Sequence, residues 1–132
     1  MLFYKFDTLC NSFFMIEWFE NLPEQCPPKD AQEPNGEKYY RLVSNIENPI
    51  EELISQRLEF PTKLFKVDEC TCCAVSVYSN IKDCEDIIKF PRHKHKKIYE
   101  LNLEKGDGLI KQTFKPSHHS WWRSTNFAKN NE

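Results

Sequence analysis

The chain has 132 residues, of which 29% are charged, and it carries a formal net charge of −2 at pH 7. This length allows one domain with a modest core. The near-neutral charge argues against a nucleic-acid partner, and the three glycines exclude a glycine-rich phosphate loop. No apolar run reaches the roughly 18 residues of a membrane-spanning helix, so we expect no membrane partner.

The first fourteen residues are apolar and aromatic, but Lys5 and Asp7 interrupt them, and they lack the pattern of a cleaved signal peptide. We predict an N-terminal extension at residues 1–14, a single domain at residues 15–125 and a frayed tail at residues 126–132. Because no export signal is seen, we expect a cytoplasmic protein.

The first predicted elements lie on both sides of a proline-rich linker at residues 26–36. Before it, Met15–Leu22 has the spacing of a short amphipathic helix. After it, Lys38–Val43 has the aromatic and β-branched content of a strand. Asn48-Pro49 is typical of a helix start, so we predict a helix from this pair to the residue before Pro61.

The middle of the chain contains the clearest strand and helix. Ala74–Tyr78 alternates as a half-buried strand does. The next helix is capped by Ser79 or Asn80 and ends before Pro91, with Cys84 as a small core residue on its apolar stripe.

The last third begins with a basic run, Arg92–Lys97, which we interpret as a solvated loop, with phosphate contact as the alternative. Ile98–Leu103 and Leu109–Phe114 are two strands that we expect to form a hairpin. The chain from Pro116 to Arg123 is expected to be irregular. This element order predicts a small single-domain α+β fold with a mixed or antiparallel sheet and two to three helices.

Six cysteines are present, and three of them fall within Cys70–Cys73. Neighbouring cysteines pair poorly with one another, and cytoplasmic thiols stay reduced, so we expect reduced thiols. The alternative is a metal site, because Cys70 and Cys73 have the spacing of half a zinc site. The candidates for the two remaining ligands are His118 and His119, or His93 and His95.

His118 and His119 precede a pair of tryptophans, Trp121 and Trp122. Adjacent residues point in different directions in an extended chain, so one histidine at most joins any given site. In one interpretation the tryptophans cover the sheet and the histidines form hydrogen bonds at its edge. In the other, a histidine beside an aromatic surface forms a pocket for a planar ligand and acts as an acid or base.

One resemblance covers about residues 15–125. The chain resembles a family of short uncharacterised bacterial proteins through these matching segments: Glu17-Trp18, Leu22-Pro23, Cys26-Pro27-Pro28, Tyr40-Arg41-Leu42, Cys70-x-x-Cys73, Ser76-Val77-Tyr78, Ile110-Lys111 and Ser117-His118-His119-Ser120-Trp121-Trp122. The resemblance implies a bacterial cytosolic domain, and no activity comes with it.

A second likeness is at the level of the fold. A strand that carries Arg41, a helix, and a strand ending in Ser76-x-Tyr78 before another helix are similar to the opening of ADP-ribosyltransferase-like domains. That resemblance implies that Arg41 and Tyr78 hold NAD. Gln112 lies nearest in position to the catalytic glutamate of such domains, and it is not a glutamate.

Two functional hypotheses follow. The first is a small binding or accessory module, with or without one structural zinc held by Cys70, Cys73 and His118, whose aromatic surface binds a protein partner or a small planar ligand. This version needs exposed tryptophans. The alternative is an ADP-ribosyltransferase-like enzyme that binds NAD or another nucleotide. It has His118, His119 and Gln112 as catalytic candidates, and it needs Arg41, Tyr78 and a histidine or Gln112 in one cleft.

Overall fold

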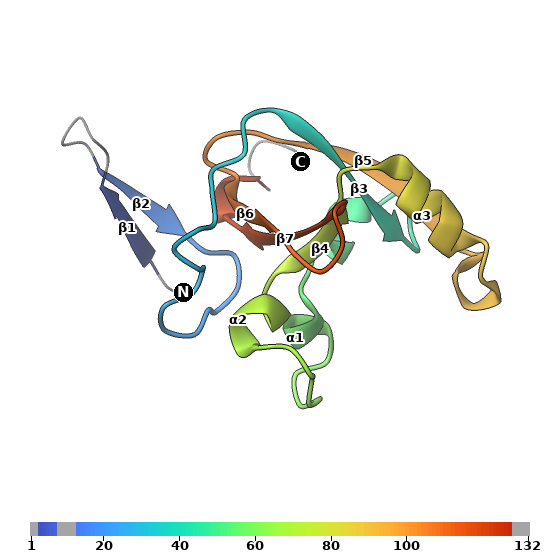
Figure 1. Cartoon of the computed structure of the whole chain (residues 1–132), viewed down its shortest axis with the longest axis horizontal. Coiled ribbons are helices and arrows are strands. Elements are labelled where there is room, and N and C mark those ends of the chain that lie inside the picture. Colours follow the sequence, from blue (N-terminus) through green and yellow to red (C-terminus); the bar gives the residue numbers. More distant parts are fainter. Residues whose placement is uncertain (1–2, 8–12, 128–132) are drawn as a thin grey trace.

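A five-stranded antiparallel sheet organises the chain, with its strands in the spatial order β5-β3-β4-β7-β6 (Figure 1). The computed structural model describes residues 3–7 and 13–127, and for residues 3–7 and 13–15 we describe the backbone alone. The prediction of a small α+β domain is confirmed. The strands of the sheet are β3 (Glu37–Val43), β4 (Val75–Tyr78), β5 (Lys97–Leu103), β6 (Gly108–Gln112) and β7 (His118–Arg123).

The helices are short and lie in the connections between strands. They are the 3-10 turn η1 (Pro49–Glu52), α1 (Gln56–Glu59), α2 (Glu69–Cys72), α3 (Ile81–Ile88) and the 3-10 turn η2 (Pro91–His93). In Figure 1, α1 and α2 lie together below the sheet. Helix α3 lies at the right-hand side of the same view, where it packs beside β3 and β5. Among the described residues, no helix has the length and apolar character needed to cross a membrane.

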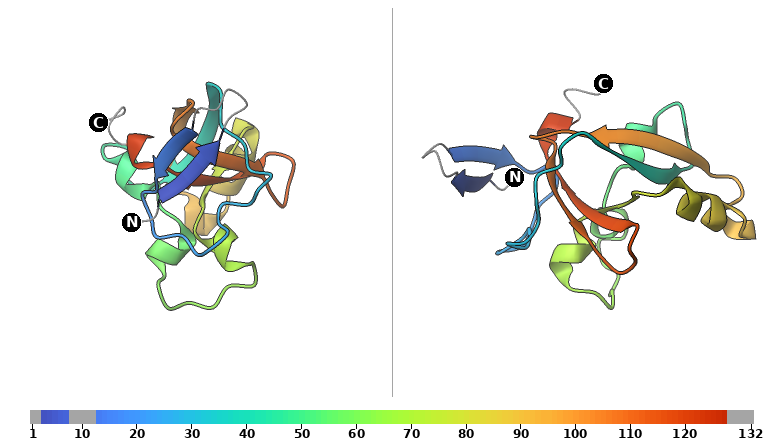
Figure 2. Two further views of the ribbon diagram at one scale, coloured as in Figure 1. Left: turned by 90° about the vertical axis from the view of Figure 1, so that its left-hand side faces the viewer. Right: turned by 45° about the horizontal axis from the view of Figure 1, so that its top comes forward.

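The N-terminal segment forms a separate two-stranded sheet. Strand β1 (Phe3–Asp7) pairs antiparallel with β2 (Phe13–Glu17), and this hairpin projects from one end of the molecule (Figure 2). The helix predicted at Met15–Leu22 is therefore wrong, because its first residues pair with β1 instead of forming helical hydrogen bonds. The boundary predicted at residue 14 falls inside β2, and residues 128–132 of the predicted tail lie outside the described residues.

The single helix predicted from Asn48-Pro49 to the residue before Pro61 is also wrong. The chain makes η1, leaves helical geometry at Leu53, and starts again as α1, where the side chain of Ser55 accepts a hydrogen bond from the backbone N–H of Leu58. The break has a physical cause. Arg41 takes the carbonyl oxygens of Glu52 and Ile54, two acceptors that a continuous helix would have used internally.

The predicted hairpin between the strands at Ile98–Leu103 and Leu109–Phe114 is wrong as well. The two segments form β5 and β6, which lie at opposite edges of the sheet: β5 pairs with β3, and β6 pairs with β7. Residues 104–107 alone join the two edges, so Leu103 and Gly108 lie at most about 18 Å apart. The sheet must therefore curl until its two edges approach each other at this end, as the strongly twisted strands in Figure 2 show.

The segment expected to be irregular forms β7, the strand between β4 and β6. Its side chains alternate, so the two adjacent tryptophans bury themselves on opposite faces of the sheet. Trp122 packs with Trp18 and Leu109, and Trp121 packs with Val75 and Phe127. With 0% and 1% of their surfaces exposed, the tryptophans cannot supply an exposed aromatic surface, and that version of the binding-module hypothesis is wrong.

Candidate functional site

A cleft of about 620 Å³ opens where the ends of β3, β4 and β7 meet α3 and η2. Basic groups from separate segments line it. They are Arg41 of β3, Arg92 and His93 of η2, Lys96 before β5, Lys115 in the β6–β7 turn, and His118 of β7. Three aromatic rings, those of Tyr78, Phe90 and Phe114, also line it. None of the described residues that line this cleft is an aspartate or a glutamate.

Arg41 forms part of the cleft wall, but most of its hydrogen-bonding capacity is directed into the protein. Its Nε donates to the carbonyl oxygen of Glu52 at 3.0 Å, and its two terminal nitrogens donate to the carbonyl oxygens of Ser76 at 2.8 Å and Ile54 at 3.3 Å. Burial lowers the pKa of Arg41 from its ordinary value, although an arginine remains charged at neutral pH. Arg41 thus places a fixed positive charge behind the cleft and ties the η1–α1 segment to β4.

Tyr78 and His118 face the cleft as a cross-strand pair at the ends of β4 and β7. Their rings meet edge to face, with centroids 5.3 Å apart. Nδ1 of His118 forms a hydrogen bond of 2.9 Å with the hydroxyl of Thr113, which is also 2.9 Å from the hydroxyl of Ser120. These two linked hydrogen bonds fix the orientation of the imidazole ring. Burial lowers the pKa of His118 below 6.5 and raises the pKa of Tyr78 above 10.0, so both side chains are neutral at pH 7.

His119 and Gln112 belong to a different cleft. The ring of His119 meets Tyr39 edge to face at 5.3 Å, and its Nδ1 lies 2.8 Å from the carbonyl oxygen of Ser117. The amide nitrogen of Gln112 donates to the carbonyl oxygen of Lys115 at 2.7 Å. His119 and Gln112 line this second cleft, of about 450 Å³, together with the acidic residues Asp30, Glu33 and Glu37. The structure does not bring together the three catalytic candidates, His118, His119 and Gln112.

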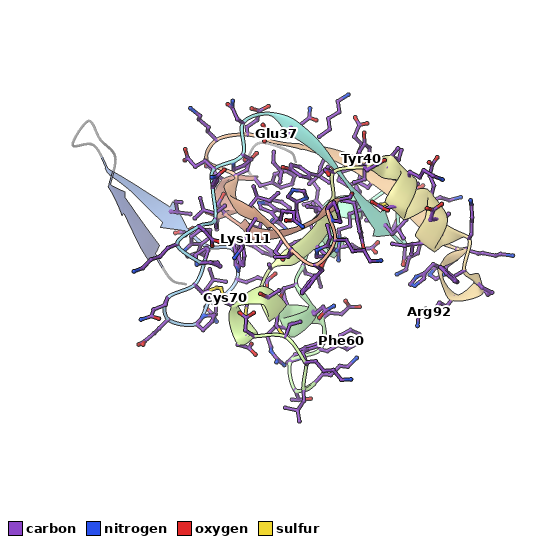
Figure 3. All side chains as sticks on the ribbon, in the orientation of Figure 1. Glu37, Tyr40, Phe60, Cys70, Arg92 and Lys111 are labelled. Atoms are coloured by element: carbon purple, nitrogen blue, oxygen red, sulfur yellow. A yellow bond between two sulfur atoms is a disulfide. The ribbon has the colours of Figure 1, made fainter. Side chains whose placement is uncertain are left out.

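The candidate zinc ligands are also separated. Cys70 forms a disulfide with Cys26, with their Cα atoms 5.5 Å apart, so the prediction of reduced thiols is wrong for this pair (Figure 3). Cys73 is a free, buried thiol, and burial raises its pKa to about 12. His118 lies in the first cleft instead. Within the described part of the chain, no group of three or more histidine, cysteine, aspartate or glutamate side chains could hold a metal ion.

Sequence reasoning found part of the first cleft and missed the rest. Arg41, Tyr78 and His118 were candidates, and the structure brings them into one cleft. The basic run Arg92–Lys97 offered phosphate contact as its alternative interpretation, and three of its residues line this cleft. Phe114 was missed because a residue at the end of an apparent strand gives no signal of a turn.

The chain matches no protein-family model, no curated protein and no solved structure. The case for a function therefore depends on the geometry and charge of the clefts.

Proposed function

We propose that this protein is a small binding module whose first cleft binds an anionic small molecule. One observation carries the proposal. The cleft gathers charged basic side chains from β3, η2, the segment before β5 and the β6–β7 turn, and its described lining contains no carboxylate. This local excess of positive charge runs against the composition of the whole chain, which has more acidic than basic residues and a net charge of −2.

The surroundings of the cleft strengthen its attraction for an anion. Clefts lined by one sign of charge focus the electrostatic field, which raises the local concentration of oppositely charged ligands. Arg41 contributes a charge held in place by three carbonyl oxygens, so it needs no reordering when a ligand arrives. Arg92, Lys96 and Lys115 form the rim of the cleft; Arg92 and Lys115 are exposed, Lys96 is half-buried, and Arg92 stands at the far end of α3 (Figure 3).

The size of the cleft favours a small molecule over a macromolecule. Sites for small molecules usually measure about 300–1,000 Å³ and combine apolar or aromatic walls with a few polar groups. The first cleft, at about 620 Å³, has this character, with Leu42 and Ile87 beside the aromatic rings and Ser76 and Gln56 among its polar groups.

The convergence of Arg41, Tyr78 and His118 in one cleft is what the nucleotide-binding alternative requires. Gln112, the nearest counterpart of a catalytic glutamate, lines the other cleft. The arrangement therefore supports binding, and we propose no catalytic step.

The test is calorimetric titration of the purified protein with inorganic pyrophosphate, at low and moderate salt. A triple variant, Arg92→Ala with Lys96→Ala and Lys115→Ala, removes the rim charges. The matched control, Lys29→Ala with Lys66→Ala and Lys105→Ala, removes the same charge from exposed positions outside the cleft. Exposed charge pairs contribute about 0.2–1 kcal/mol each, so the rim variant should bind about tenfold more weakly and the control should bind as the wild type does.

Salt should weaken binding by the wild type, because rim charges are screened. Equal losses in the two triple variants would show that pyrophosphate responds only to net charge, and would contradict a specific cleft.

A further inference from the structure

Phe114 occupies an unusual position in the turn between β6 and β7. Its φ angle is +61°, in the left-handed region, and 67% of its surface is exposed. The turn is closed by hydrogen bonds from the backbone N–H of Thr113 to the carbonyl oxygen of His118, at 2.9 Å, and from the N–H of His118 to the carbonyl oxygen of Lys115, at 3.1 Å.

The fold itself does not explain a phenylalanine at this position. The left-handed region is unfavourable for a bulky side chain, and asparagine or glycine adopts it far more readily. A ring that is two-thirds exposed also gains little from burial. Strained residues of this kind cluster at ligand sites, where the local conformation serves recognition.

The ring of Phe114 belongs to a group of three rings inside the first cleft. Its centroid lies 5.1 Å from that of His118, at an interplanar angle of 48°, and the ring of His118 lies 5.3 Å from that of Tyr78. His118 is fixed in turn by its hydrogen bond to Thr113. The exposed face of Phe114 is thus held over the cleft by a rigid base of aromatic side chains.

We propose that Phe114 stacks on a planar ring of the ligand, and that the ligand belongs to the class of nucleoside phosphates. The inference rests on the proposed anion-binding function and deepens it. The basic rim of the cleft accounts for the phosphate, and the three-ring group accounts for the base. Lys115, which also lines the cleft, directly follows Phe114 in the chain, so the positions for ring and anion adjoin each other.

The experiment separates the ring from the anion by comparing ADP with inorganic pyrophosphate. Phe114→Asn removes the aromatic face and places a residue that tolerates the left-handed conformation. Phe60→Asn is the matched control, because Phe60 is an exposed phenylalanine that lies beside α1, away from the cleft (Figure 3). Phe114→Trp keeps an aromatic face and tests for rescue.

We expect the wild type to bind ADP more tightly than pyrophosphate. Stacking of a base on an aromatic side chain is worth about tenfold or more in affinity, so Phe114→Asn should lose about that factor for ADP and nothing for pyrophosphate. Phe60→Asn should leave both affinities unchanged, and Phe114→Trp should retain ADP binding. The midpoint of thermal unfolding of Phe114→Asn should rise by about 3 °C, because the backbone strain is relieved.

The outcomes distinguish the two proposals. Absence of binding of both ligands by the wild type would overturn anion binding and the ring site together. Binding of pyrophosphate with an ADP affinity that Phe114→Asn leaves unchanged would overturn the ring site alone. A lower unfolding midpoint in Phe114→Asn would show that the ring stabilises the fold, and would remove the argument from strain.

Discussion

Arg41 offers the sharpest test of how the cleft is built. A ligand-binding arginine and an arginine that holds the fold together respond differently to substitution. The structure assigns Arg41 mainly to the second role, since its guanidinium donates to the carbonyl oxygens of Glu52, Ile54 and Ser76. We expect Arg41→Met, which keeps the apolar part of the side chain, to lower the free energy of unfolding strongly.

The magnitude follows from these three bonds. A hydrogen bond to a charged group contributes about 1.5–3 kcal/mol. The full sum overstates the loss, because Arg41 borders the cleft and water can reach some of the carbonyl oxygens that it leaves. We therefore expect a loss of about 3–4 kcal/mol, a large share of the roughly 5–15 kcal/mol that stabilise a domain.

Urea unfolding followed by tryptophan fluorescence measures this loss, because both Trp121 and Trp122 are buried and report on the core. With a slope of about 2 kcal/mol per molar urea, the midpoint should fall by about 1.5–2 M. Arg92→Met is the control, since Arg92 is an exposed arginine at the rim of the same cleft, and it should shift the midpoint little. An unchanged midpoint in Arg41→Met, together with lost pyrophosphate binding, would refute this reasoning.

Three further changes test the fold and the cleft. Reduction of the Cys26–Cys70 disulfide, which spans 44 residues, should lower the free energy of unfolding by about 4 kcal/mol, measured by urea unfolding with and without reductant; an unchanged midpoint would contradict it. Gly108→Ala should cost at least about 3 kcal/mol or prevent folding, because φ is +126° and the added Cβ would overlap the carbonyl oxygen of Trp122; a native circular dichroism spectrum and midpoint would contradict this. Burial lowers the pKa of His118 in the folded state, so the unfolded state binds its proton first, and stability should fall as the pH drops from about 6.5 through the folded pKa. His118→Gln should lose less stability than the wild type between pH 7 and pH 5, and equal losses would exclude this origin of the pH dependence.

Local patterns in the sequence predicted the elements that local forces determine. Strands β3 and β4 follow from aromatic and β-branched alternation, and α3 begins directly after its N-cap Asn80, whose side chain accepts a hydrogen bond from the backbone N–H of Lys82. The bounds of these elements follow from local propensity and capping, although their packing partners lie far away in the sequence.

Pairing between distant segments could not be read from local patterns. Strands β5 and β6 are consecutive and alternate, which favours a hairpin. Instead β5 pairs with β3 and β6 pairs with β7, at opposite edges of the sheet. The break between η1 and α1 depends on Arg41, which lies 11 and 13 residues before its acceptors in Glu52 and Ile54. Each error comes from a long-range contact that outweighs a local preference.

The cysteine cluster shows the same limit in the candidate site. The Cys70-x-x-Cys73 spacing alone suggested Cys70 as a zinc ligand. In the structure, Asp68 caps the short helix α2 that contains Cys70, and Cys70 forms its disulfide with Cys26, which lies 44 residues away. Disulfide geometry argues against disulfides between neighbouring cysteines, but it does not exclude a disulfide with a cysteine far away in the sequence.

The register of β7 determines which of the two adjacent histidines, His118 or His119, lines the basic cleft. A shift of one residue in β7 would exchange its faces, bringing His119 into the basic cleft and His118 into the acidic one. The two tryptophans prevent this shift, because each is buried on its own face and fixed by its indole N–H: Trp121 to the carbonyl oxygen of Asp107 and Trp122 to that of Cys70, both at 2.9 Å. The tryptophans, which one hypothesis placed on an exposed surface and the other on the sheet, are therefore the residues that decide which histidine lines the basic cleft.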